Sequence, residues 1–143
     1  MTGPASDPFN IERFVDAQAE VFSQVLAELR AGRKRSHWMW FIFPQIAGLG
    51  SSDMAQYFAI SGRAEALEYL AHPTLGPRLR ECTELVNQAP NCTVNEIFGY
   101  PDDLKFRSSV TLFAAVAPGE AAFRAALDKY FAGQPDPATL ARL

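Results

Sequence analysis

The sequence predicts an all-α protein, a compact single-domain orthogonal helical bundle of about seven helices over residues 1–143. Apolar residues recur at three- and four-residue spacing in almost every segment, which is the spacing of one helix face. Gly, Pro and capping residues separate these segments and mark where helices start and stop. The 143 residues are 48% hydrophobic and 20% charged, so the chain holds enough apolar material for one core. Residues 1–6 precede the first helix signal and are expected to be flexible.

The first helix is expected to run from Asp7-Pro8 to Gly32. Aspartate is a preferred N-cap, proline is tolerated at the first helical position, and glycine commonly ends a helix. Arg13, Glu20 and Glu28 lie off the apolar face of this helix, where solvent is expected. The apolar face itself consists of Phe14, Ala17, Val21, Val25 and Leu29.

The rest of the chain repeats this arrangement in shorter segments. Thr93-Val94-Asn95-Glu96 fits a capping box, in which each end residue satisfies a free backbone donor. His72, before Pro73, is interpreted as a structural cap whose imidazole meets the last carbonyl groups of a helix. Further helices are expected over residues 54–61, 63–70, 75–86, 94–98, 102–117, 120–132 and 138–143.

One pair of segments also permits a strand interpretation. Trp38–Phe43 is rich in strand-favouring residues, and Val110–Val116 could be its partner strand. A lone strand leaves its backbone groups unpaired, so both segments would have to be strands together. The second segment is rich in alanine and follows a good N-cap, which favours a helix. We therefore prefer the all-α prediction and keep the two-stranded alternative.

Composition limits the class of protein. A net charge of −3 and a pI near 5.3 exclude a protein that coats nucleic acid or an anionic membrane through bulk charge. The longest apolar run, Trp38–Phe43, is too short to span a bilayer. Met1–Asp7 has neither the basic head nor the apolar stretch of a signal peptide. We expect a cytoplasmic protein with no membrane partner.

The unusual segment of the chain is Gly32–Gln45, which holds both tryptophans and three consecutive basic residues. It is followed by Gly48-Leu49-Gly50-Ser51-Ser52, where glycines allow close backbone approach to an anion and hydroxyls can donate. Basic side chains add charge-assisted contacts, and an indole can stack on a flat ring. The candidate ligand-binding residues are Arg33, Lys34, Arg35, His37, Trp38, Trp40, Ser51 and Ser52. The alternative is that the aromatic run is simply the centre of the core.

Evidence for catalysis is sparse in the sequence. Proton-transfer candidates are His37, Asp103 and Lys105, of which the last two lie near the start of one predicted helix. Asp102 is interpreted as the N-cap of that helix, and Asp103 and Arg107 are spaced to pair on it. The glycine loop lacks the lysine of a P-loop, and no His/Cys spacing suits a metal. We expect no metal and no cofactor, and the motifs do not decide whether the protein is an enzyme.

Matching segments extend over nearly the whole chain: Asp7-Pro8-Phe9, Gly32–Gln45, Gly48-Leu49-Gly50, Tyr69–Pro73, Leu75–Leu79, Ile97-Phe98-Gly99, Asp102–Lys105 and Ser108–Phe113. Together they resemble a bacterial family of unknown function, and His37–Phe41 is the most specific part. The resemblance implies a mainly helical fold and transfers no catalytic residues. Members sometimes carry the name calpastatin, a disordered protease inhibitor, which the composition of this chain does not support. Phe106 departs from the smaller aliphatic residue expected after Lys105.

Two functions follow from these observations. The first is a protein that binds, or acts on, a small anionic ligand with a phosphate and a nucleotide-like ring. It requires a concave pocket in which the candidate residues converge. The second is a non-catalytic helical interaction module or homodimer, in which the tryptophan segment is exposed as an apolar patch. Nucleic-acid binding ranks third, because the basic run is short and the chain is acidic.

Overall fold

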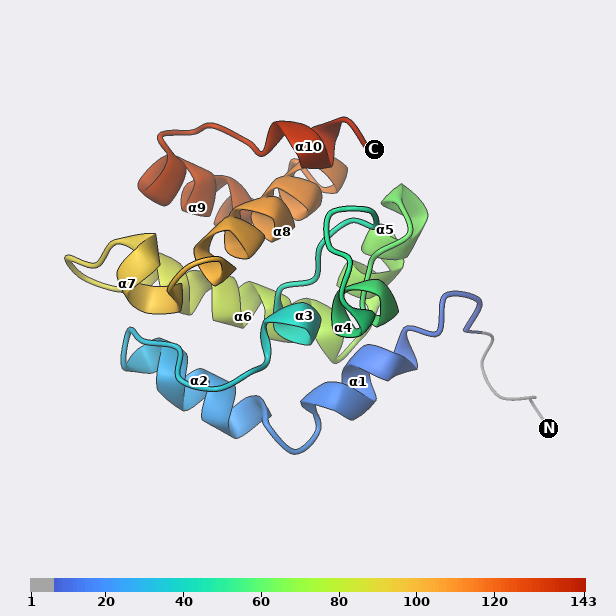
Figure 1. The fold of residues 1–143 in the computed structure, drawn as a ribbon, viewed down its shortest axis with the longest axis horizontal. Coiled ribbons are helices and arrows are strands. Elements are labelled where there is room, and N and C mark those ends of the chain that lie inside the picture. The colour runs from blue at the N-terminus through green and yellow to red at the C-terminus, as the bar shows by residue number, and fades with distance from the viewer. Residues whose placement is uncertain (1–6) are drawn as a thin grey trace.

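Ten helices and the loops that join them make up residues 7–143, the part of the chain that the computed structural model describes (Figure 1). These residues form no strand, so the all-α prediction is confirmed and the two-stranded alternative is wrong. The helices are α1 (Glu12–Gln18), α2 (Phe22–Arg30), α3 (Met39–Ile42), α4 (Asp53–Tyr57), α5 (Arg63–Ala71), α6 (Leu75–Gln88), α7 (Val94–Phe98), α8 (Asp102–Val116), α9 (Ala121–Phe131) and α10 (Pro137–Leu140). The expected flexibility of residues 1–6 falls outside the described part of the chain.

Helix α8 is the centre of the bundle. It packs against α5, α7, α9 and α10, and its residues Ser108–Phe113 are all buried. A helix covered on so many sides is buried nearly all round rather than along one stripe. Figure 1 shows α8 between the C-terminal helices α9 and α10 above and α6 below, with α1 and α2 along the opposite edge.

The first predicted helix is two helices, and this split partly explains why the expected number of about seven was too low. Asp7 is not the N-cap as predicted, since that position is Ile11, but its carboxylate oxygens accept from the backbone N–H groups of Ile11 and Glu12 at 2.7 and 3.0 Å. Asn10, however, has a left-handed φ of 52°, and the helix starts only after it. The break between α1 and α2 lets α1 pack against α3 while α2 packs against α6. Packing therefore overrides the continuous helical pattern.

The aromatic run forms the short helix α3, which the sequence did not predict as a helix. Trp38, Met39 and Phe41–Phe43 are buried, so this run is largely core. The Phe43 ring lies edge-to-face with the rings of Phe98 and Phe106, at centroid distances of 5.8 and 5.0 Å. Such pairs stabilise a core beyond the area that they bury.

One predicted helix cap is confirmed and two differ in detail. The Thr93–Glu96 capping box of α7 is present as predicted. The caps at His72 and Asp102 differ. His72 does cap, but its Nδ1 accepts from the backbone N–H groups of Thr74 and Leu75 at the start of α6, rather than donating to carbonyls of α5. Asp102 is the first residue of α8 and Pro101 is its N-cap. This shift leaves the carboxylate of Asp102 available for ion pairs.

None of the helices in residues 7–143 combines the length and the apolar character needed to cross a bilayer.

Candidate functional site

A buried carboxylate shapes the loop that carries the basic triplet. Glu28 of α2 is only 5% exposed, although the sequence placed it off the apolar face. Its oxygens accept from the backbone N–H groups of Arg35 and Ser36, from the Ser36 hydroxyl, and from the Trp38 indole at 2.9 Å. Gln24 donates a further hydrogen bond to Oε2. Glu28 therefore holds the loop in one conformation on the end of α2.

The hydrogen bonds also set the charge of Glu28. Burial is the largest single influence and raises the pKa of the carboxyl, but the donors at Ser36, Arg35, Gln24 and Trp38 together outweigh it. The pKa of Glu28 falls from 4.5 to about 2. The group is therefore a stable anion at neutral pH, as a carboxylate that only accepts hydrogen bonds must be.

The three basic residues of the loop do not form one patch. The side chain of Lys34 is 8% exposed, and its ammonium lies 2.8 Å from the carboxylate of Asp102. The backbone N–H of Lys34 donates to the carbonyl of Ile97 at 2.7 Å. Arg33 and Arg35 are exposed on either side. Lys34 thus ties the loop to α7 and α8, whereas its neighbours face solvent.

The two tryptophans occupy different environments. Trp38 is 1% exposed and donates its indole N–H to Glu28, which makes it a core residue. Trp40 is half-buried, and the ammonium of Lys105 lies 5.4 Å from the centre of its ring. This is a cation–π distance. His37, between the loop and α3, is exposed.

A groove of about 450 Å³ lies between the 45–52 loop, the start of α8 and the start of α10. Its lining combines apolar side chains with hydroxyl, amide and charged groups. It brings Ser51, Ser52 and Lys105 together, although the serines and the lysine are far apart in the sequence. The residues that line it are Gln45, Leu49, Gly50, Ser51, Ser52, Ala55, Pro101, Leu104, Lys105, Ser108 and Asp136.

Lys105 is the cation of this groove. Its ammonium is 3.6 Å from Oδ1 of Asp102, which is an ion pair too long for a good hydrogen bond. In the described part of the chain its N–H donors have no hydrogen-bond acceptor. Ser52 uses its oxygen to cap α4 by accepting from the N–H of Ala55 at 3.1 Å, and its O–H stays free to donate. Ser51 is exposed at the same edge.

Asp103, a predicted proton-transfer residue, makes hydrogen bonds within the fold and lies outside the groove. Its oxygens accept from its neighbour Leu104 at 2.9 Å and from the Asn95 side chain at 3.3 Å, and it does not line the groove. Arg107 does not pair with it as the spacing suggested. The Arg107 guanidinium donates to the carbonyls of Gln134 and Pro135, which fixes the segment before α10.

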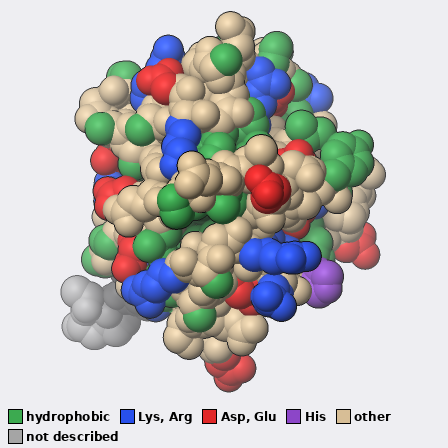
Figure 2. Space-filling view, turned by 90° about the vertical axis from the view of Figure 1, so that its left-hand side faces the viewer, with side chains coloured by type: hydrophobic (Ala, Val, Ile, Leu, Met, Phe, Trp, Pro, Cys, Tyr) green, Lys and Arg blue, Asp and Glu red, His purple; other side chains and the backbone are tan. Residues whose placement is uncertain are grey.

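Charge on the surface is mixed. On the face drawn in Figure 2, Lys and Arg side chains alternate with Asp and Glu, and no broad single-sign area forms. Residues 7–143 contain no group of three or more His, Cys, Asp or Glu side chains placed to hold a metal ion.

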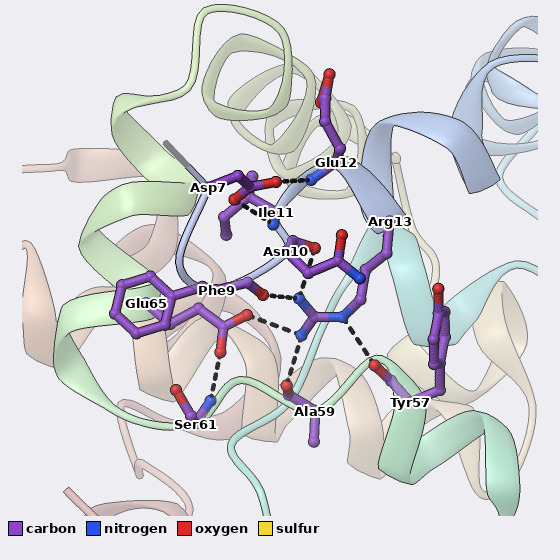
Figure 3. Close-up of polar contacts among 10 residues, drawn as sticks. All are labelled: Asp7, Phe9, Asn10, Ile11, Glu12, Arg13, Tyr57, Ala59, Ser61 and Glu65. Carbon is purple, nitrogen blue, oxygen red and sulfur yellow. Dashed lines mark hydrogen bonds and ion pairs between the residues drawn. The ribbon is translucent and has the colours of Figure 1, made fainter. Parts of the chain in front are cut away.

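A second buried polar centre, which the sequence reading missed, joins α1 to α5 (Figure 3). The guanidinium of Arg13 lies 2.7 Å from Oε2 of Glu65, and both side chains are almost fully buried. Oε1 of Glu65 accepts from the backbone N–H of Ser61 at 2.8 Å. Arg13 also donates to the backbone carbonyls of Phe9, Asn10, Tyr57 and Ala59. Its donors are fully used, so this centre organises the fold and has no free group for a ligand.

Comparison with known proteins extends over nearly the whole chain. Residues 8–143 match the family described as "Protein of unknown function (DUF1810)". The chain belongs to this family. Among solved structures it is similar to the conserved hypothetical protein Rv1873 from Mycobacterium tuberculosis, with 56% sequence identity and a TM-score of 0.95. That match covers 96% of this chain and 98% of the other, so the two chains share one fold over the matched residues. No curated protein matches the chain.

Proposed function

We propose that this member of the family binds a small phosphate-bearing, nucleotide-like ligand in the groove between the 45–52 loop and α8. The observation that carries the proposal is the position of Lys105. Its ammonium reaches a groove lined by Ser51 and Ser52 while it lies over the ring of Trp40. A cation, hydroxyl donors and an aromatic face are the groups that recognise a phosphate beside a flat ring.

The phosphate is bound by Lys105 and the serine hydroxyls. Lys105 has N–H donors without acceptors in the described residues, so an anion gains charge-assisted hydrogen bonds without breaking one. The contact of the ammonium with Asp102, at 3.6 Å, is long and weak, so the ammonium can move toward a bound phosphate at little cost. Gly50, which lines the groove, packs closely against Ala55, since a Cβ there would lie 2.7 Å from the Cβ of Ala55.

The ring of the ligand is placed by Trp40, which adjoins the groove at Lys105, and by the apolar side chains that line the groove. Trp40 is half-buried, so one part of its indole is fixed and another is accessible. Leu49 and Leu104 supply apolar surface within the groove itself. Most small-molecule sites combine such apolar walls with a few polar groups. Of the predicted ligand-binding residues, only Ser51 and Ser52 line the groove, and Trp40 adjoins it through its contact with Lys105. The other predicted residues, Arg33, Lys34, Arg35, His37 and Trp38, do not line it.

Tryptophan fluorescence tests this function, because Trp40 lies beside the proposed site and Trp38 is buried. We expect adenosine monophosphate to give a saturable change in emission. Lys105→Gln removes one charge-assisted contact and should weaken binding by about tenfold or more. Arg30→Gln removes the same charge from an exposed, weakly paired side chain of α2 and serves as the matched control. Absence of any saturable change with the wild-type protein contradicts the proposal, as does equal binding by the Lys105 variant.

A homodimer is the second candidate, and exposed apolar side chains favour it. Tyr100 is 78% exposed and Leu104 49% exposed, at the same end of α8 as the groove. Exposed apolar clusters of this kind often mark interfaces. Trp38 is buried and does not contribute to that surface, so the surface differs from the tryptophan patch that the sequence suggested. Light scattering decides the question, since a homodimer has twice the 15.8 kDa mass of the chain.

A further inference from the structure

We infer that the ligand carries hydroxyl groups next to its phosphate, as a ribose phosphate does, and that Asp136 recognises them. This inference rests on the proposed function and adds a specificity-determining residue to the same groove. Asp136 lies just before α10 and lines the groove opposite the 45–52 loop. A carboxylate repels a phosphate, so the presence of Asp136 in a groove proposed for a phosphate-bearing ligand suggests that it binds another part of that ligand.

One oxygen of Asp136 is committed to the fold. Oδ2 accepts from the hydroxyl of Ser108 at 3.0 Å, from the backbone N–H of Thr139 at 3.2 Å, and from the Thr139 hydroxyl at 2.6 Å. The backbone N–H of Asp136 donates to the hydroxyl of Thr111 at 2.9 Å. These bonds cap α10 and fix the carboxyl group against α8.

The other oxygen is uncommitted. Oδ1 accepts no hydrogen bond from residues 7–143, and it is not one of their buried unpaired side-chain atoms, which are Asn87 Oδ1 and Ser109 Oγ. A carboxylate oxygen only accepts hydrogen bonds, so a ligand group that binds there in place of water is a donor such as a hydroxyl or an amine. Fixed in orientation by the contacts of Oδ2, Oδ1 is prepared to receive that donor without further ordering.

Lys105 and Asp136 present opposite charges to one groove. Ser108, the α8 partner of Asp136, lies three residues beyond Lys105, a rise of about 4.5 Å along the helix axis, so both charged residues meet the same stretch of α8. A cation and an acceptor so placed suit an anionic group beside a neutral donor group. The negative charge of Asp136 also disfavours a phosphate at its own end, which orients the ligand with its phosphate toward Lys105.

The test compares adenosine monophosphate with its 2′,3′-dideoxy analogue, which lacks both ribose hydroxyls, by calorimetric titration. The decisive variant is Asp136→Asn, which keeps one acceptor oxygen for the cap of α10 and replaces the free oxygen by an NH₂ donor. We expect the wild-type protein to bind the ribose form about tenfold more tightly. In the Asn variant this difference should vanish, through weaker binding of the ribose form.

A second variant guards against a folding defect. Serine at position 136 can also cap a helix but lacks the second oxygen. If the Asn variant is unstable, Asp136→Ser replaces it in the test and should lose the same discrimination. Equal binding of the two nucleotides by the wild-type protein overturns the inference and leaves the proposed function standing. The inference is likewise overturned if both variants still bind the ribose form more tightly than the dideoxy form, as the wild type does. Absence of binding by either nucleotide overturns the proposed function itself.

Discussion

Glu28, like Arg13, has an environment that its place in the sequence pattern did not predict. It lies off the apolar stripe of its helix, yet it is buried with five hydrogen bonds from the described residues. Glu28→Gln places an NH₂ donor against donors and should lower the free energy of unfolding by about 2 kcal/mol. Glu20→Gln, at an exposed position on the segment between α1 and α2, is the matched control and should change little. Urea unfolding followed by fluorescence measures both.

The same carboxylate predicts a pH dependence. The pKa of Glu28 is lowered from 4.5 to about 2 on folding, so its contribution is fully present above pH 4.5. As the pH falls through 2, the folded protein binds the proton and the contribution is lost. The gap in stability between wild type and Glu28→Gln should therefore shrink between pH 4.5 and 2. A gap that is constant across this range contradicts the assigned role.

The individual site residues could be predicted only in part. Ser51, Ser52, Trp40 and Lys105 were identified from residue type and local spacing, and the fold brings them near one groove. Asp136 was missed because its role depends on contacts with Ser108, which lies 28 residues away in the sequence. Adjacent residues of the basic loop alternate between buried and exposed because Glu28 and Asp102 fix Lys34 and leave its neighbours in solvent. The alternation depends on tertiary contacts, so the sequence of the loop alone does not predict it.

At the scale of elements, α5 and α6 approach each other at Gly76. A Cβ added there would lie 2.1 Å from the carbonyl oxygen of Leu70, which is backbone and cannot move aside. Alanine normally stabilises a helix by about 1 kcal/mol relative to glycine. Here we expect the reverse, with Gly76→Ala costing about 2 kcal/mol or more through overpacking.

Gly119 provides the matched comparison for this prediction. A Cβ at Gly119, between α8 and α9, meets nothing within 4 Å. Gly119→Ala should therefore leave the melting temperature unchanged or slightly raised. A Gly76 variant that melts with the wild type would show that the α5–α6 contact is looser than described.

Element boundaries followed local signals where these were strong. The capping box at Thr93 and the aspartate cap at Asp136 both start helices in the structure. The break between α1 and α2 carries no such signal, because residues 19–21 include neither proline nor glycine. It arises from the different partners of the two helices. The helical content was thus predictable from periodicity, whereas the division of the first helix was not.

At the scale of the whole molecule, the Arg13–Glu65 pair fastens the first helix to the middle of the chain. Removing one partner leaves a buried charge without compensation, which typically costs about 3–5 kcal/mol. Arg13→Met and Glu65→Met should each be strongly destabilising, and the double variant should cost clearly less than the sum. Urea unfolding of all four proteins gives the coupling energy. Additive effects would mean that the two charges do not act as a pair.

The central claim is that the groove beside Trp40 binds a ligand, and one NMR titration tests it most directly. The chain has two indole N–H groups, one buried at Trp38 and one half-buried at Trp40. On addition of adenosine monophosphate, we predict saturable shifts of the Trp40 indole signal and of the Gly50, Ser51 and Lys105 amides. The Trp38 indole signal should stay in place. A spectrum that does not change, or shifts confined to residues 33–37, would contradict the account.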